Sequence, residues 1–242
     1  MHRLRDKVWY MRDADVFRDL SEPEVSRLAD RALMREYGRG GVILQPGKPS
    51  DLIFIIKEGR VKVSTYSLDG REQILAILEP GDLFGEQALV GEYEPAHMEA
   101  LEDTIVCGVP REDFEEVLHA HPDTGLRILR ALAKRLRLAE EEIENLVFRD
   151  VPGRLASALL RLGEAYGLRD AENGPIRLTL RLTHQDLASM IGATRETVTT
   201  ILTRFRDEGL TDLQQHLIVI RQPEKLRTLM RRAGRRAKSR SI

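Results

Sequence analysis

The chain has few of the residues that covalent or metal-based chemistry needs. Its 242 residues include a single cysteine, Cys107, which excludes a disulfide framework, a thiolate cluster and a cysteine-based zinc site within one chain. We expect Cys107 to be a small buried apolar residue. Residues 42–109 offer only His97 as an imidazole ligand, too few for a metal-enzyme site of clustered His and Glu. No nucleophile or acid–base pair stands out elsewhere, so the sequence predicts no enzyme and no metal site.

Long hydrophobic runs are also missing. No apolar stretch approaches the roughly 18 residues that a bilayer span needs. The first 17 residues are charged throughout and lack the pattern of a secretion signal. We therefore expect a cytoplasmic protein without a membrane partner.

The charges that are present are unevenly distributed. Residues 151–242 hold 17 Lys and Arg against 9 Asp and Glu, whereas residues 1–150 hold 21 against 30. This separation is expected where one part of a protein meets a polyanion and the other does not. The length also suits two domains, each able to build its own core.

Residues 182–210 predict two short helices around a tight turn, the arrangement of a DNA-reading helix-turn-helix. Thr183 and Asp186 have the spacing of a reciprocal helix cap, and Gly192 ends the first helix. The second helix opens near Thr194. Its apolar positions share one face, namely Val198, Ile201, Leu202 and Phe205.

The residues left outside the second helix suit contacts with base edges. Arg195 can bind guanine O6 and N7 together, and Glu196 can accept from cytosine N4 or orient Arg195. The alternative is an ordinary helical hairpin whose Glu196 only favours the helix dipole. Thr183, Gln185 and Arg204 are candidates for phosphate contacts. The predicted DNA-binding residues are Thr183, Gln185, Thr194, Arg195, Glu196, Thr199, Thr200 and Arg204.

The first half of the chain reads as small helices followed by many short strands. Residues 15–36 show apolar helical spacing, with Ser21 as a cap and Pro23 in the first turn. From residue 42 to 109, short apolar or alternating runs are separated by Pro-Gly, Glu-Gly and Asp-Gly turns. Evenly spaced short strands predict a sandwich, jelly roll or barrel.

A long helix is predicted over residues 124–148, with a heptad seam that favours a homodimer. We expect Arg135 and Glu140 to pair between the two helices. The alternative is a helix that packs on its own chain. The predicted interface residues are Leu129, Leu132, Leu136, Ala139, Ile143 and Leu146.

The segments that follow predict a winged domain and a basic tail. Residues 150–153 form an interruption, residues 154–166 a helix and residues 167–175 a loop. Strands at 176–182 and 216–221 flank the helix-turn-helix. Beyond Pro223 the tail holds eight Lys and Arg against one acid, so it either embraces phosphates or is a frayed solvated end.

Three ordered segments carry a resemblance that covers nearly the whole chain: PGDLFGE (80–86), NLVFRDVPGRLASALLRL (145–162) and ATRETVTTIL (193–202). They resemble the catabolite-activator and fumarate-nitrate-regulator superfamily of bacterial transcription factors. The resemblance implies an α+β protein with an N-terminal jelly-roll domain like those that bind cyclic nucleotides (1–120). A dimerisation helix (121–149), a winged helix-turn-helix domain (150–223) and a basic tail (224–242) follow.

The resemblance also implies an effector pocket, formed here by Gly85, Glu86, Gln87, Ala139 and Glu140. In members that respond to cyclic AMP, the Gly and Glu hold the ribose and a later Arg-Ser pair holds the phosphate. Here Glu94 and Pro95 stand near the Arg-Ser positions, and Ala139 and Glu140 replace the Thr-Ser pair that reads adenine. A phosphate beside uncompensated carboxylates is unfavourable, so cyclic AMP is disfavoured and no cofactor is predicted.

Other sensing chemistry is excluded in the same way. One cysteine cannot hold an iron–sulfur cluster, and no histidine spacing indicates a haem ligand. Either an unidentified effector binds, or the dimer is already competent for DNA; we favour the second.

The function that the resemblance implies is sequence-specific transcription regulation, and we favour activation. A homodimer would bind palindromic double-stranded DNA. RNA polymerase would contact loops such as residues 67–72 and 164–169. The family usually has an Arg where this chain has Thr200, so that one base contact is lost or exchanged for packing on a thymine methyl. The alternative is a regulator of the same fold that depends on a cyclic nucleotide or another small molecule.

Overall fold

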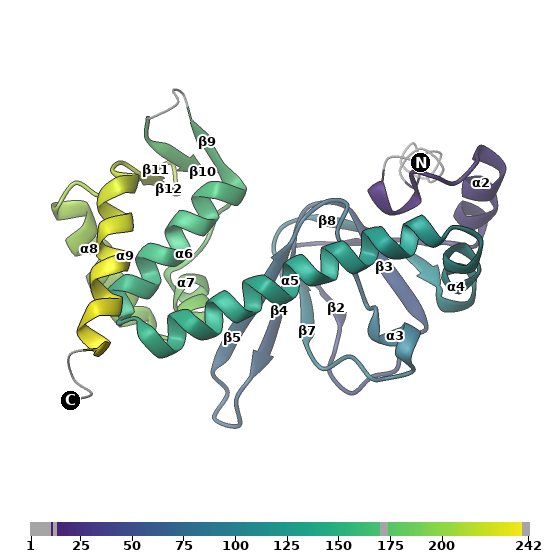
Figure 1. Cartoon of the computed structure of the whole chain (residues 1–242), viewed down its shortest axis with the longest axis horizontal. Helices are drawn as coiled ribbons and strands as arrows, with labels where there is room; N and C mark the ends of the chain where they lie inside the picture. The colour runs from purple at the N-terminus through teal and green to yellow at the C-terminus, as the bar shows by residue number, and fades with distance from the viewer. Residues whose placement is uncertain (1–10, 12–13, 170–173, 239–242) are drawn as a thin grey trace. The chain divides into compact units, whose positions relative to one another are not determined.

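The computed structural model describes residues 11, 14–169 and 174–238. The chain divides into two compact units (Figure 1). The N-terminal unit comprises residues 1–67 and 74–136, and the C-terminal unit comprises residues 68–73 and 137–242. Helix α5 (Pro122–Phe148) contributes residues to both. Among the described residues, no helix combines the length and the apolar character that crossing a membrane requires.

The N-terminal unit is built on two four-stranded sheets, which confirms the predicted jelly-roll type of fold. One has the strand order β1-β8-β3-β6 and the other β2-β7-β4-β5. Side chains from both sheets form one core, in which the rings of Phe54 and Phe84 stack with centroids 5.1 Å apart. The strands are β1 (Leu33–Tyr37), β2 (Val42–Leu44), β3 (Leu52–Glu58), β4 (Val61–Tyr66), β5 (Glu72–Leu78), β6 (Leu83–Phe84), β7 (His97–Ala100) and β8 (Thr104–Pro110).

A second core joins the outer face of the roll to the helices, with Phe17 and Phe114 meeting edge to face at 6.0 Å between ring centroids. Cys107 is buried there, as predicted. The helices of this unit are the 3-10 turn η1 (Asp15–Phe17), α2 (Glu22–Arg31), α3 (Gln87–Val90), α4 (Arg111–Ala120) and the first part of α5.

The predicted helical segment 15–36 is wrong at its end. Helix α2 begins after Ser21, whose capping box with Glu24 is present, but it stops at Arg31. Residues 33–37 form β1 instead and pair with β8 from Leu33–Gly108 to Tyr37–Thr104. Sheet pairing with a strand far along the chain overrides the local apolar spacing.

In its described residues, the C-terminal unit combines the helices α6 to α9 with a small sheet of the order β11-β12-β10-β9. Helix α6 (Val151–Tyr166) begins inside the predicted interruption, because the Asp150 carboxylate accepts a hydrogen bond from the Gly153 amide at 2.9 Å and caps it. Part of the predicted loop is a strand. The remaining elements are β9 (Gly167–Arg169), β10 (Ile176–Leu178), α7 (His184–Ile191), α8 (Arg195–Asp207), β11 (Thr211–Gln214), β12 (Leu217–Ile220) and α9 (Pro223–Lys238).

The basic tail begins as an ordered helix rather than a frayed end. Helix α9 covers Pro223–Lys238, and the Leu226 side chain is fully buried. Arg227 forms ion pairs with Glu224 and Glu164. The side chains of residues 231–242, which carry most of the predicted positive charge, lie outside the described ones.

Candidate nucleic-acid interface and effector cradle

Helices α7 and α8 form the predicted helix-turn-helix. The Thr183 hydroxyl accepts from the Asp186 amide at 3.0 Å, and the Asp186 carboxylate accepts from the Thr183 amide at 2.7 Å, so the predicted reciprocal cap is confirmed. Gly192 ends α7 with a φ of 60°, a left-handed conformation that glycine adopts at low cost. The tight turn therefore follows from local sequence.

Helix α8 buries one face and exposes the other, as its spacing predicts. The Thr194 hydroxyl caps it by accepting from the Thr197 amide at 3.2 Å. Val198 and Phe205 are fully buried and Ile201 nearly so. The side chains on the exposed face are Arg195, Glu196, Thr199, Thr200, Thr203 and Arg204.

Three threonines make this exposed face polar and compact. The hydroxyls of Thr199, Thr200 and Thr203 each donate to the carbonyl four residues earlier, at 2.9, 3.0 and 2.9 Å. Each side chain therefore has a defined rotamer and presents a methyl group and an acceptor lone pair outward. The ring Nδ1 of His184 lies 2.8 Å from the Thr199 hydroxyl, which ties α7 to α8 on this face.

Glu196 lies in the first turn of α8, and its pKa is lowered. The causes, in order, are hydrogen bonds from its own amide and from the Thr194 hydroxyl, with Arg195 adding a favourable charge. The carboxylate thus satisfies the helix N-terminus and is also exposed to solvent. Arg204 is exposed and lies 3.8 Å from Glu208.

A tight hairpin of β11 and β12 follows the helix-turn-helix. Its turn residues Gln215 and His216 have φ values of 50° and 64°, which matches the twist that two-residue hairpins require. At its base, Arg221 and Asp212 form an ion pair at 2.7 Å. Strand β12 lies within the predicted strand 216–221 and also pairs with β10. Strand β11 was not predicted, and the predicted strand 176–182 ends at Leu178.

The loop at Gly85 has the close approach that a cradle needs. Gly85 has a φ of +79°, and a Cβ there would lie 3.0 Å from the Leu52 carbonyl oxygen and 3.3 Å from the Phe54 ring. Only glycine fits both the backbone conformation and the space. Glu86 and Gln87 follow at the start of α3.

Glu86 already has an internal partner. The Arg135 guanidinium donates to the Glu86 carboxylate at 3.1 Å and to the Leu83 carbonyl at 2.7 Å. Arg135 is therefore held by the roll of its own chain, and this contact competes with the predicted pairing between Arg135 and Glu140 of a second helix. Because 49 residues separate Arg135 from Glu86 in the sequence, no local spacing pattern predicts this contact.

Glu94, which the resemblance puts near the family's Arg-Ser positions, is buried in the structure. Its side chain is 6% exposed, and its carboxylate accepts one hydrogen bond, from the Ala96 amide at 3.3 Å. Burial raises the pKa of Glu94, and the nearby charge of Glu86 raises it further, while Arg135 opposes the shift. This end of the cradle thus holds the carboxyl groups of Glu94 and Glu86, and that of Glu94 is shielded from solvent.

Helix α5 exposes an apolar stripe that differs in part from the predicted seam. Leu129, Leu136 and Ile143 are each more than 60% exposed. Leu132, however, packs against the core of its own roll, and Leu146 lies next to Gly192. The exposed stripe at heptad spacing is Leu126, Leu129, Ala133, Leu136, Ile143 and Val147, with the exposed Glu140 between them. Ala139 is also exposed.

Two family models match the chain in order. A cyclic nucleotide-binding domain matches residues 34–121, and a Crp-like helix-turn-helix domain matches residues 153–229. A relative from Mycobacterium tuberculosis, named a CRP-like cAMP-activated global transcriptional regulator, is 31% identical over 217 residues, covering 88% of this chain and 95% of the relative. The chain belongs to the CRP/FNR family of transcriptional regulators.

Further relatives agree with this family. A protein from Thermus thermophilus named cyclic AMP receptor protein is 32% identical, over 88% of this chain and 94% of its own length. The solved structure of a CooA mutant from Carboxydothermus hydrogenoformans superimposes with a TM-score of 0.74 at 27% identity, over 89% of this chain and 94% of that one. A CRP/FNR regulator from Thermus thermophilus gives 0.67 at 29% identity, over 84% and 100%.

As a CRP/FNR family member, the protein is a DNA-binding transcriptional regulator and not an enzyme. Among the described residues, no group of three His, Cys, Asp or Glu side chains converges to hold a metal ion.

Proposed function

We propose that the protein regulates transcription as a homodimer that inserts one α8 from each chain into the major groove of a palindromic site. The exposed stripe of α5 is the observation that carries this proposal. Leucine and isoleucine side chains more than 60% exposed along one helix face are costly in water and are stabilised when a second copy covers them. A twofold pair of helix-turn-helix domains then faces two half-sites one DNA turn apart.

The exposed face of α8 supports direct base reading. Arg195 and Glu196 lie at its N-terminal end, where recognition helices meet base edges. Thr199 and Thr200 offer methyl groups suited to thymine. Thr194 opens the helix, and Thr183, Gln185 and Arg204 are exposed around it, which suits phosphate contacts. Because DNA is the partner, we place the protein's action in the cytoplasm.

We further propose that DNA binding does not require cyclic AMP. The carboxylate of Glu94 stands where the family's phosphate-binding Arg is expected, and it is buried beside Glu86. A phosphate there would meet two negative groups and one guanidinium that is already engaged. The second candidate, a cyclic-nucleotide-dependent regulator, is favoured by the names of the relatives from Mycobacterium tuberculosis and Thermus thermophilus.

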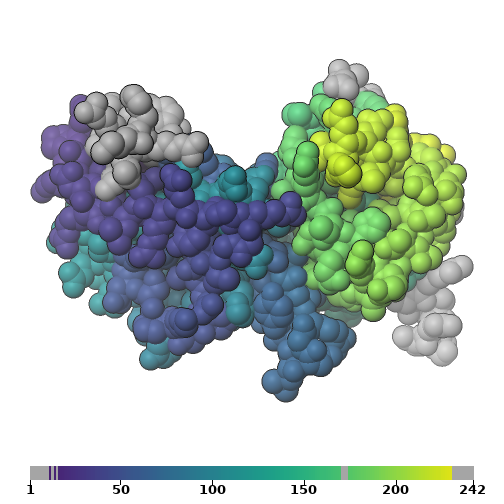
Figure 2. Space-filling view, turned by 180° about the vertical axis from the view of Figure 1, so that it is seen from behind, coloured from purple at the N-terminus to yellow at the C-terminus, as the bar shows by residue number. Residues whose placement is uncertain are grey.

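We assign an activating role with contacts to RNA polymerase at exposed loops. The hairpin of β4 and β5 projects as a narrow tongue (Figure 2, blue), and Leu68 at its tip is fully exposed. The segment around Glu164 to Arg169 is the second candidate surface. An apolar side chain at a hairpin tip suits a protein partner better than solvent.

Selection from a randomised duplex library, with the apo protein and with added cyclic AMP, tests these proposals together. We expect a palindromic sequence to be enriched without nucleotide, with affinity that falls steeply with salt. Enrichment only with cyclic AMP would favour the second candidate. Failure to enrich any sequence in either condition would contradict both.

A further inference from the structure

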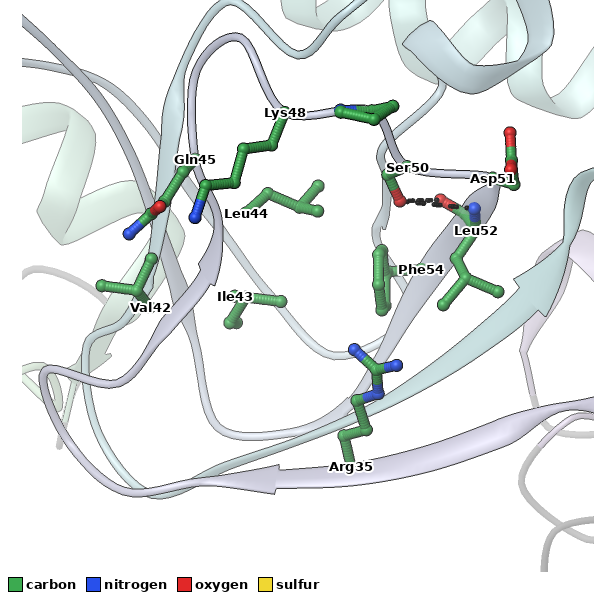
Figure 3. Close-up of a pocket in the computed structure, with 11 residues that line it drawn as sticks. Arg35, Val42, Ile43, Leu44, Gln45, Lys48, Ser50, Asp51, Leu52 and Phe54 are labelled. Carbon is green, nitrogen blue, oxygen red and sulfur yellow. Dashed lines mark hydrogen bonds between the residues drawn. The ribbon is translucent and has the colours of Figure 1, made fainter.

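A pocket of about 490 Å³ opens in the N-terminal unit beside the cradle loop (Figure 3). Its walls come from β1, β2, β3 and the loop between β2 and β3. Strands β1 and β2 are edge strands of the two sheets, so the pocket lies where the roll is open at its side. The volume is in the range of small-molecule sites, roughly 300–1,000 Å³.

The floor of the pocket is apolar and touches the cradle loop. Leu44, Leu52 and Phe54 line it, and the same three residues surround the position of a Cβ on Gly85. Val42 and Ile43 extend the apolar lining. A bound molecule would therefore be in contact with the residues that shape the Gly85 turn.

Two cations reach this apolar space from different elements. Arg35 is exposed and lies on the same face of β1 as Tyr37, which packs against the inner core, so its side chain reaches the pocket from the open rim. Figure 3 shows its guanidinium directed at the apolar residues, while Lys48 comes from the loop on the other side. Within the described part of the chain, neither cation has an ion-pair partner. The one acid of the lining, Asp51, points away from the apolar residues.

We propose that this pocket binds a small amphipathic anion, with its apolar body on Leu44, Leu52 and Phe54 and its anionic head between Arg35 and Lys48. An unpaired guanidinium and an ammonium beside an apolar floor are complementary to such a molecule, because charge-assisted hydrogen bonds fix the head while the body leaves water. The lining does not include Glu94, whose carbonyl accepts a hydrogen bond at 3.1 Å from the Gly47 amide in the loop between β2 and β3. The pocket lies within the N-terminal unit, and its binding is measured without DNA.

A charged arginine on an edge strand has a second use, since it prevents the edge from pairing with another chain. The two roles differ in a measurable way. If Arg35 only prevents strand pairing, the pocket binds no ligand. If the pocket is a binding site, it prefers a molecule that has both an apolar tail and a negative charge.

Isothermal titration calorimetry of the full chain tests the proposal with octanoate and octyl phosphate as probes, and with acetate and 1-octanol as partial molecules. We expect one octanoate or octyl phosphate per chain, and binding at least tenfold weaker for acetate and for octanol. Arg35→Gln and Lys48→Gln should each weaken binding by about tenfold. Arg39→Gln, an exposed cation on the turn outside the lining, should leave it unchanged.

The outcomes separate cleanly once circular dichroism shows that the variants are folded. Preference for the carboxylate or for the phosphate head supports the proposal and identifies the head group. Absence of octanoate and octyl phosphate binding, equal binding of octanol, or equal effects of Arg39→Gln and Arg35→Gln would overturn it. Binding of the selected DNA duplex by the same variants keeps this result distinct from a failure of the proposed function.

Discussion

Helix α8 and the cradle around Gly85 retain different parts of the family pattern. At α8 the backbone and the leading Arg195 and Glu196 fit the pattern that the resemblance implies, and Thr200 is the one outward position noted to depart from it. At the cradle the glycine turn is retained, but the resemblance puts the buried Glu94 near the position where the family has a cation. A shared fold preserves the backbone of a ligand site. Which ligand binds there depends on the charged side chains that line the site.

The largest effect is expected from substitutions in the exposed stripe of α5, which is the proposed dimer interface. Leu129→Glu with Leu136→Glu places four carboxylates in a twofold interface and removes four apolar contacts, each worth roughly 1.5 kcal/mol. We expect the dissociation constant of the dimer to rise by at least about a thousandfold. DNA binding should be lost together with the dimer. Analytical ultracentrifugation measures the dissociation constant. Ala131→Glu, also exposed on α5 but off the stripe, is the control, and an unchanged dimer in the double variant would contradict the assigned interface.

The reading of bases by α8 is tested by Arg195→Ala. Because the bidentate contact with guanine is lost, the free-energy preference for one base pair of each half-site should fall by about 1–3 kcal/mol. Competition binding with single-base variants of the selected duplex measures it. Arg227→Ala removes a cation held in ion pairs on α9 and should leave the base preference as it is. The same preference in Arg195→Ala and the wild type would remove Arg195 from the reading residues.

The cradle can be brought closer to the family pattern by Glu94→Arg with Pro95→Ser. If the missing cation explains the expected weakness for cyclic AMP, this variant should bind it at least about tenfold more tightly than the wild type, because a charge-assisted hydrogen bond to phosphate contributes roughly 1.5–3 kcal/mol. Calorimetry measures the affinity. Glu92→Arg with Pro95→Ser puts the same charge on an exposed neighbour; an equal gain there would mean that net charge alone is responsible.

Local encoding of the helix-turn-helix is tested by Thr183→Val. The hydroxyl that accepts from the Asp186 amide is lost, so the free energy of unfolding should fall by about 1 kcal/mol. Thr203→Val removes a hydroxyl that only donates to an i−4 carbonyl and should change stability by less than about 0.5 kcal/mol. Urea unfolding of the DNA-free protein compares the two, and equal losses would argue against the cap.

The smallest effect is a pH dependence at Glu94. Its raised pKa means that the folded state holds the proton more tightly, so this contribution to stability is complete below the ordinary value of 4.5 and is lost as pH rises through the folded pKa. Glu94→Gln stays neutral and should become more stable relative to the wild type between pH 4.5 and 7. Urea unfolding across this range measures it, with Glu92→Gln as the control. A constant difference at all pH values would show that the Glu94 charge is not penalised.

The sequence by itself determined the local architecture. Local signals predicted most of the helices and strands, because each acts over only a few residues of the sequence. These signals are the caps at Thr183 and Thr194, the glycine turns and the helical and strand periodicities. The tertiary structure decided what depends on distant residues: the strand at 33–37, set by pairing with β8, and the engagement of Arg135 by Glu86. It also decided which leucines of α5 stay exposed. Burial and charge pairing depend on which segments meet in space, and a heptad pattern fits a helix facing its own core as well as one facing a partner.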